Sequence, residues 1–88
     1  MIKTFKDLEF KPHRWEPNSL QAVLNFDNDY GVSVLFGDYF YSNTSLNTYE
    51  VGILFEGHLC YTTPLTDDVI GYCTESEITE IMRKIQEL

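Results

Sequence analysis

The chain has 88 residues, of which 14 are Asp or Glu and 6 are Lys or Arg, so we expect a single domain with a net charge of −8. Its hydrophobic content of 43%, with six Tyr and six Phe, excludes a disordered acidic tail. No apolar run reaches the roughly 18 residues of a membrane span, and residues 1–7 lack the apolar stretch of a signal peptide, so we expect a cytoplasmic protein.

The first 19 residues allow two interpretations. Residues 4–8 fit a single capped turn, whereas residues 8–11 alternate in the manner of a short strand. Pro12 and Pro17 argue against any long element in this segment. The sequence therefore leaves the structure of residues 1–19 open.

Four segments between residues 20 and 62 alternate between apolar and polar side chains and are rich in β-branched and aromatic residues, which predicts strands. The segments are 20–26, 30–36, 49–55 and 58–62, with residues 39–41 continuing the second one beyond a bulge. Turn-forming residues join the first two at Asp27-Asn28-Asp29 and the last two at Glu56-Gly57. Such short connections favour an antiparallel meander.

The segment 74–88 predicts an α-helix. Thr74 and Glu77 form a capping box at its start. Arg83 and Lys84 stand near its end, where the helix dipole favours positive charge. An apolar stripe at helical spacing consists of Ile78, Ile81, Met82, Ile85 and Leu88.

The predicted fold is α+β, with an antiparallel sheet of about four strands over residues 20–62 and the helix 74–88 packed on one face. Between them, Pro64 ends the fourth strand and Thr66-Asp67-Asp68 predicts the cap of a short helical turn through residues 69–71. By strand parity, the opposite face of the sheet mixes polar and apolar side chains and is either solvated or a docking surface. Its predicted members are Ser33, Leu35, Glu50, Gly52, Leu54, Glu56, His58 and Cys60.

No motif in the sequence carries a recognisable catalytic chemistry. The candidate soft metal ligands are His13, His58, Cys60 and Cys73, and of these only His58 and Cys60 are as close as zinc ligands usually are. Negative surroundings disfavour a cysteine thiolate, and no glycine-rich phosphate loop or serine elbow is present. We therefore expect a non-enzymatic protein with no metal and no cofactor, whose two cysteines are reduced thiols.

The distribution of charge predicts a partner. No Lys or Arg lies between Arg14 and Arg83, whereas 11 of the 14 acidic residues do. Such a stretch repels nucleic acid and anionic membranes and attracts basic surfaces. Tyr residues, which are enriched at protein interfaces, stand beside several of the acids. The predicted contacts are Asp27, Asp29, Asp38, Tyr39, Glu50 and Glu56.

A pattern spread over residues 30–88 resembles small bacteriophage or prophage proteins. It consists of Tyr30-Gly31-Val32-Ser33-Val34, Tyr49-Glu50-Val51, Thr63-Pro64-Leu65-Thr66-Asp67-Asp68-Val69-Ile70-Gly71-Tyr72 and Thr74-Glu75-Ser76-Glu77. In size and acidity the chain is also similar to anti-CRISPR and other anti-defence proteins, several of which act as DNA mimics. The resemblance implies a small inhibitor of a basic, nucleic-acid-binding nuclease complex in the cytoplasm of a bacterial host.

A second hypothesis is a structural or assembly module of a phage or mobile element that associates with itself, for example as a homodimer. An open sheet has two edges, and an edge that is not blunted pairs with another chain. The candidate contact is Tyr39-Phe40-Tyr41, three aromatic residues near the predicted bulge. On this hypothesis the acidity serves solubility.

Overall fold

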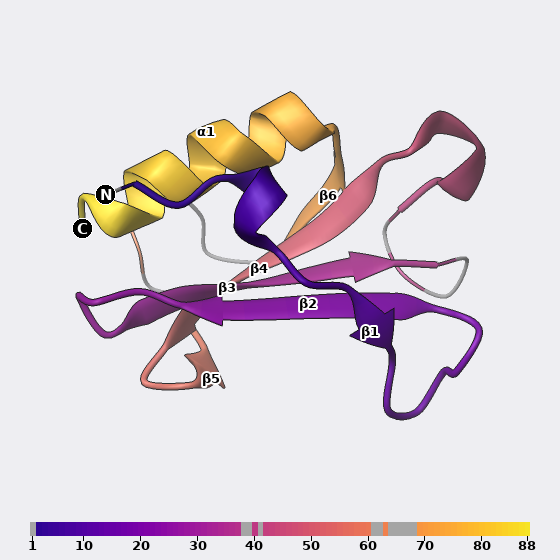
Figure 1. Ribbon diagram of the computed structural model, residues 1–88, viewed down its shortest axis with the longest axis horizontal. Helices are drawn as coiled ribbons and strands as arrows, with labels where there is room; N and C mark the ends of the chain where they lie inside the picture. Colours follow the sequence, from indigo (N-terminus) through magenta and orange to yellow (C-terminus); the bar gives the residue numbers. More distant parts are fainter. Residues whose placement is uncertain (1, 38–39, 41, 61–62, 64–68) are drawn as a thin grey trace.

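The computed structural model describes residues 2–37, 40, 42–60, 63 and 69–88. Within them the chain has an α+β fold, in which one helix covers one face of an antiparallel sheet (Figure 1). The elements are the 3-10 turn η1 (Phe5–Asp7), β1 (Lys11–Pro12), β2 (Leu20–Asn25), β3 (Tyr30–Phe36), the 3-10 turn η2 (Thr44–Leu46), β4 (Tyr49–Phe55), β5 (His58–Leu59), β6 (Ile70–Cys73) and α1 (Glu75–Gln86).

Strands β1 to β5 lie next to one another in chain order, each antiparallel to its neighbour. Strand β6 returns to pair with β4, on the edge that faces away from β3. Strands β5 and β6 share this edge, because β5 pairs with Leu54 and Phe55 while β6 pairs with Tyr49 and Val51. The sheet is therefore a meander that a sixth strand completes.

The predicted strand count of about four is too low, since the described residues form six strands. Strands β2, β3 and β4 confirm the prediction, and β5 is shorter than predicted. The helical turn predicted for residues 69–71 is wrong at Ile70 and Gly71, which belong to β6. Pairing with β4 satisfies backbone groups on the open edge of that strand and packs Ile70 against the core. The sequence could not show this, because a segment of three residues is too short for a period that distinguishes a helical turn from a strand.

Parts of the prediction fall outside the described residues. These parts are the predicted cap at residues 66–68, the end of the fourth strand at residues 61–62, and positions 39 and 41 of the predicted continuation. Phe40 is described, and its ring contacts that of His13 with centroids 5.1 Å apart.

The core lies between the sheet and α1. The inward side chains of β2, β3 and β4 alternate with outward ones, as the parity of the sequence requires. The helix contributes its predicted stripe except Leu88, which is exposed and lies beyond the end of α1. The buried members are Ala22, Val32, Val34, Tyr49, Val51, Ile53, Cys73, Ile78, Met82 and Ile85. Each large apolar side chain among them contributes about 1.5–3 kcal/mol by burial. The predicted capping box of Thr74 and Glu77 is present at the start of α1.

The N-terminal segment packs against this core. Thr4 and Asp7 form a capping box around η1, so the capped turn of residues 4–8 is confirmed, while the strand pairing begins at Lys11. The rings of Phe5 and Phe10 lie 5.3 and 5.7 Å from the ring of Tyr49. Aromatic packing of this kind explains why residues without a long element are still held in place.

Candidate binding surface

Two turns lie side by side at one end of the sheet: the turn between β2 and β3, and the turn between β4 and β5. The backbone N–H of Glu56 donates a hydrogen bond of 2.8 Å to the carbonyl of Asp29. Behind the turns, Tyr30 and Phe55 are register partners, and their ring centroids lie 4.9 Å apart. The positions of the two turns are therefore fixed relative to each other.

The backbone of both turns is left-handed at an acidic residue. Asp29 has φ 70, Glu56 has φ 51, and Gly57 follows with φ 85. Two successive residues with positive φ are typical of a type I′ hairpin turn, whose first position favours Asn, Asp or Gly. A glutamate there costs about 1 kcal/mol of backbone strain. The turn thus holds a carboxylate at a position where another residue would be more stable.

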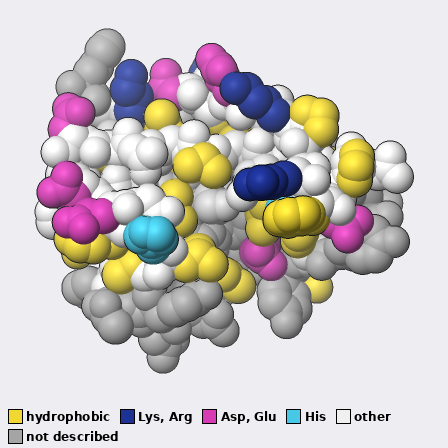
Figure 2. Space-filling model, turned by 90° about the horizontal axis from the view of Figure 1, so that it is seen from below, with side chains coloured by type: hydrophobic (Ala, Val, Ile, Leu, Met, Phe, Trp, Pro, Cys, Tyr) yellow, Lys and Arg dark blue, Asp and Glu magenta, His cyan; other side chains and the backbone are white. Residues whose placement is uncertain are grey.

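Asp27, Asp29 and Glu56 form what we call the acidic turn patch, and all three are exposed. Figure 2 looks onto the sheet face away from α1 and shows Asp and Glu side chains along its left margin, the end at which the two turns lie in Figure 1. No ion pair within the described residues involves any of the three. The patch is therefore a concentrated negative charge, which attracts cations.

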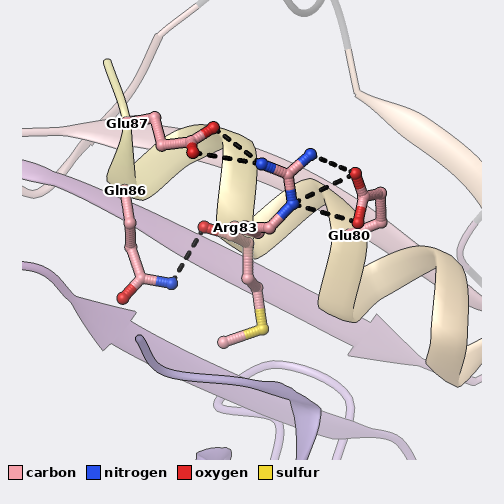
Figure 3. A network of polar contacts seen from close by, with 5 residues as sticks. Glu80, Arg83, Gln86 and Glu87 are labelled. Carbon is pink, nitrogen blue, oxygen red and sulfur yellow. Dashed lines mark hydrogen bonds and ion pairs between the residues drawn. The ribbon is translucent and has the colours of Figure 1, made fainter. Parts of the chain in front are cut away.

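Among the described residues, two acidic side chains at the C-terminal half of α1 form ion pairs, unlike those of the acidic turn patch. Arg83 lies between Glu80 and Glu87 and forms ion pairs with both, at 2.8 Å between its Nη1 and Glu87 Oε1 (Figure 3). The hydrogen bond from Arg83 and the charges of Arg83 and Lys84 hold the pKa of Glu80 below its usual range. Much of the negative charge on the helix is thus balanced locally.

Of the other predicted contacts, Glu50 lies elsewhere. It pairs with Leu35 near the start of β4, about 20 Å along the strand from Glu56 at the usual rise per residue. Asp38 and Tyr39 lie outside the described residues. The structure therefore brings together three of the six predicted contacts and places Glu50 apart from them.

A hollow of about 390 Å³ opens on the sheet face away from α1. Its lining consists of Gln21, Val23, Ser33, Leu35, Glu50, Gly52, Leu54, Gly57, His58, Leu59 and Val69. Six of the eight residues predicted for this face are among them; Glu56 and Cys60 are not. A Cβ atom at Gly52 would lie 2.9 Å from Leu59 Cδ2, so the absent side chain leaves room for Leu59. At Gly57 the hollow lies next in sequence to Glu56 of the acidic turn patch.

A second hollow of about 320 Å³ lies beside β1 and shares Gln21 and Val23 with the first. Its other lining residues are Glu9, Lys11, Pro12 and Arg14. The guanidinium of Arg14 lies 5.0 Å from the ring centroid of Trp15, which is 75% exposed. Figure 2 shows a Lys or Arg side chain beside a hydrophobic one on this half of the face.

Sequence reasoning missed Lys11, Arg14 and Trp15 as surface residues of interest. A signal was present, because Arg14-Trp15 stands between two prolines, where a loop is expected, and Trp and Arg often dominate binding interfaces. His13 orders this loop, since its Nδ1 accepts the backbone N–H groups of Trp15 and Glu16 at 3.1 and 3.2 Å.

Cys73 offers little nucleophilic chemistry. It is buried, and this burial, with the negative charge of Glu77 as a smaller cause, raises the pKa of its thiol to about 11. Such a thiol stays protonated and unreactive at neutral pH. Among the described residues, no three His, Cys, Asp or Glu side chains come together in a way that could hold a metal ion.

Comparison of the chain with known protein families, with curated proteins and with solved structures found no match in any of the three. Within the described part of the chain, no helix is both long and apolar enough to cross a membrane.

Proposed function

We propose that this chain is a non-enzymatic inhibitor that binds a basic, nucleic-acid-handling protein of a bacterial host, as its resemblance to anti-defence proteins implies. The acidic turn patch is the contact. The observation that carries the proposal is the hydrogen bond between Glu56 and Asp29, because it joins two turns into one negative surface. A surface that is ordered before binding loses little conformational entropy when the partner docks.

The charge of the whole chain supports the same proposal. A net charge of −8 with no Lys or Arg between Arg14 and Arg83 steers a basic protein toward this domain. Carboxylates accept strong, charge-assisted hydrogen bonds from Arg, which also binds phosphates. When the carboxylates of this chain occupy the nucleic-acid site of the partner, they therefore compete directly with DNA.

The test is capture of binding proteins from bacterial lysate on the immobilised chain, followed by elution with rising salt or with duplex DNA. The key variant carries Asp27→Asn, Asp29→Asn and Glu56→Gln. Asn tolerates the left-handed backbone at position 29, so this variant keeps the turn. The matched control carries Glu75→Gln, Glu80→Gln and Glu87→Gln, which changes the net charge equally on the helix.

We expect the wild type and the control to retain a nucleic-acid-binding protein that duplex DNA releases, and the turn variant to lose it. Association should weaken steeply with salt, since charges are screened beyond about 8–10 Å near physiological ionic strength. Equal retention by the turn variant, or a captured protein that DNA does not displace, would overturn the proposal.

A further inference from the structure

We propose that β2 pairs edge to edge with β2 of a second copy of this chain, antiparallel and about a two-fold axis. This inference goes beyond the proposed function, because its centre is the free edge of the sheet instead of the acidic turn patch.

Strand β1 covers only the first part of the β2 edge. It pairs with Leu20 and Gln21, and the His13 N–H extends the contact by donating to the Ser19 carbonyl at 2.8 Å. In an antiparallel ladder, alternate residues direct their backbone groups to the same neighbour. Val23 and Asn25 therefore direct their N–H and C=O groups outward, beyond Lys11 at the start of β1. Among the described residues, no strand pairs with them on that side.

The part of this edge that β1 leaves uncovered lacks three features that keep edges from pairing: a charged residue, a proline and a bulge. Strand β2 holds no charged residue and no proline, and its register with β3 runs without a bulge. Monomeric proteins usually protect an edge by one of these means. Val23, at the start of the free stretch, is 52% exposed. The edge has the properties of a strand that pairs with another strand.

Charge identifies a second copy as the occupant. Lys11 and Arg14 lie at one end of the free stretch, where they line the second hollow together with Val23. Glu9 also lines this hollow, so this end carries two positive charges against one negative charge. Asp27 and Asp29 lie at the other end, in the turn that follows β2. A two-fold axis through the middle of an antiparallel pair brings opposite ends together. Each copy then places its acidic end against the basic end of the other, so two complementary contacts form.

The second hollow fits this arrangement. Side chains directly opposite each other in an antiparallel pair point to the same face of the sheet. The side chain opposite Val23 therefore enters the hollow of about 320 Å³ that Val23 and Lys11 line. The net charge of −8 on each copy opposes association at long range, but salt screens distant charges more than it screens close pairs.

The test is a charge swap followed by sedimentation equilibrium from micromolar to millimolar concentration. One variant carries Lys11→Glu and Arg14→Glu, and the other carries Asp27→Lys and Asp29→Asn. Each variant alone places like charges at both contacts, so we expect its self-association to weaken roughly tenfold or more. An equimolar mixture restores opposite charges at both contacts, and we expect dimers of mixed composition.

A backbone variant tests the edge itself. Val23→Pro removes an outward N–H that the ladder with β3 does not use, so we expect a monomer with the circular dichroism spectrum of the wild type. Val23→Thr, which keeps the N–H, should still form the dimer. A wild type that is monomeric at every concentration, or a dimer that persists in both charge variants alone, would overturn the inference.

The Lys11→Glu and Arg14→Glu variant also separates this inference from the proposed function. It retains Asp27, Asp29 and Glu56, so a basic partner should bind it at least as well as it binds the wild type. Dimerisation and partner binding both use Asp27 and Asp29, and we expect the two to compete.

Discussion

The side-chain amide of Gln86 holds the backbone of Lys3 by two reciprocal hydrogen bonds. Its Oε1 accepts the Lys3 N–H at 2.8 Å, and its Nε2 donates to the Lys3 carbonyl at 2.9 Å, across 83 positions of the sequence. The Phe5 N–H adds a bond of 3.2 Å to Thr79 Oγ1. Figure 1 shows the two chain ends close together as a result. Helix α1 therefore anchors the segment that leads to β1.

Gln86→Glu should loosen this anchor. A carboxylate still accepts the Lys3 N–H, but it cannot donate to the Lys3 carbonyl or to the Met82 carbonyl, to which Gln86 also donates (Figure 3). We expect the free energy of unfolding to fall by about 1 kcal/mol and the Lys3 and Phe5 amides to exchange faster. Urea unfolding and hydrogen exchange measure both. The control is Glu87→Gln, which changes only an exposed ion pair; equal exchange rates in the two variants would contradict the prediction.

Asn28 should tolerate neither Ala nor Asp. Its Nδ2 donates to the Ile85 carbonyl at 2.9 Å near the end of α1, and its Oδ1 accepts the Tyr30 N–H at 3.2 Å. Ala removes both bonds, at a cost of about 1–2 kcal/mol. Asp keeps the bond from Tyr30 but places a negative charge at the negative end of the helix dipole. We expect both variants to unfold at lower urea concentrations than an Asp27→Asn control. An unchanged midpoint for Asn28→Asp would refute the role of the Asn28 Nδ2 group.

The capping box should make stability depend on pH. Hydrogen bonds with Thr74 lower the pKa of Glu77. Its stabilisation is therefore complete above the unfolded-state pKa of about 4.3 and is lost as the pH falls through the lower folded-state value. Thr74→Ala should cost about 1 kcal/mol at neutral pH. Glu77→Gln keeps the capping pattern without the charge, so its stability should vary less between pH 5 and pH 3, measured by urea unfolding.

The two cysteines should differ in reactivity. Cys73 is 2% exposed and its pKa is raised to about 11, while Cys60 is half-buried. We expect iodoacetamide to label Cys60 roughly tenfold faster than Cys73 at pH 8, with mass spectrometry of single Cys→Ser variants as the measurement. Because the folded-state pKa of Cys73 lies above the unfolded value of about 8.5, stability should also decline as the pH rises from there toward 11. The two cysteines should be labelled at equal rates only when urea has unfolded the chain.

Glu56→Asn should separate stability from binding. Asn is favoured at the first position of a type I′ turn, where Glu56 has φ 51. We expect a gain of about 1 kcal/mol in stability together with weaker binding to a basic partner. Thermal unfolding and the lysate capture described above measure the two effects. A variant that is both less stable and equally well bound would contradict the role assigned to Glu56.

Regular patterns made the central elements predictable. Strands β2, β3 and β4 and helix α1 each direct apolar side chains toward the core on one side, which gives their sequences a period of 2 or 3.6 residues. The capping box at Thr74 and the turn at Glu56-Gly57 follow from side-chain and backbone preferences that neighbouring residues decide. Their positions therefore appear in the sequence without knowledge of the fold.

Contacts between residues distant in sequence determined the short strands and the location of the charged surfaces. Strands β1 and β6 are too short to carry a period, and they exist because β2 and β4 present open edges to them. The net acidity is a property of the sequence, but the acidic turn patch arises because the Glu56 N–H meets the Asp29 carbonyl. The basic end of the β2 edge likewise forms where β1 begins, with Lys11 opposite Gln21. Composition determines the charge of a protein, whereas only contacts between residues distant in sequence determine where on the surface that charge gathers.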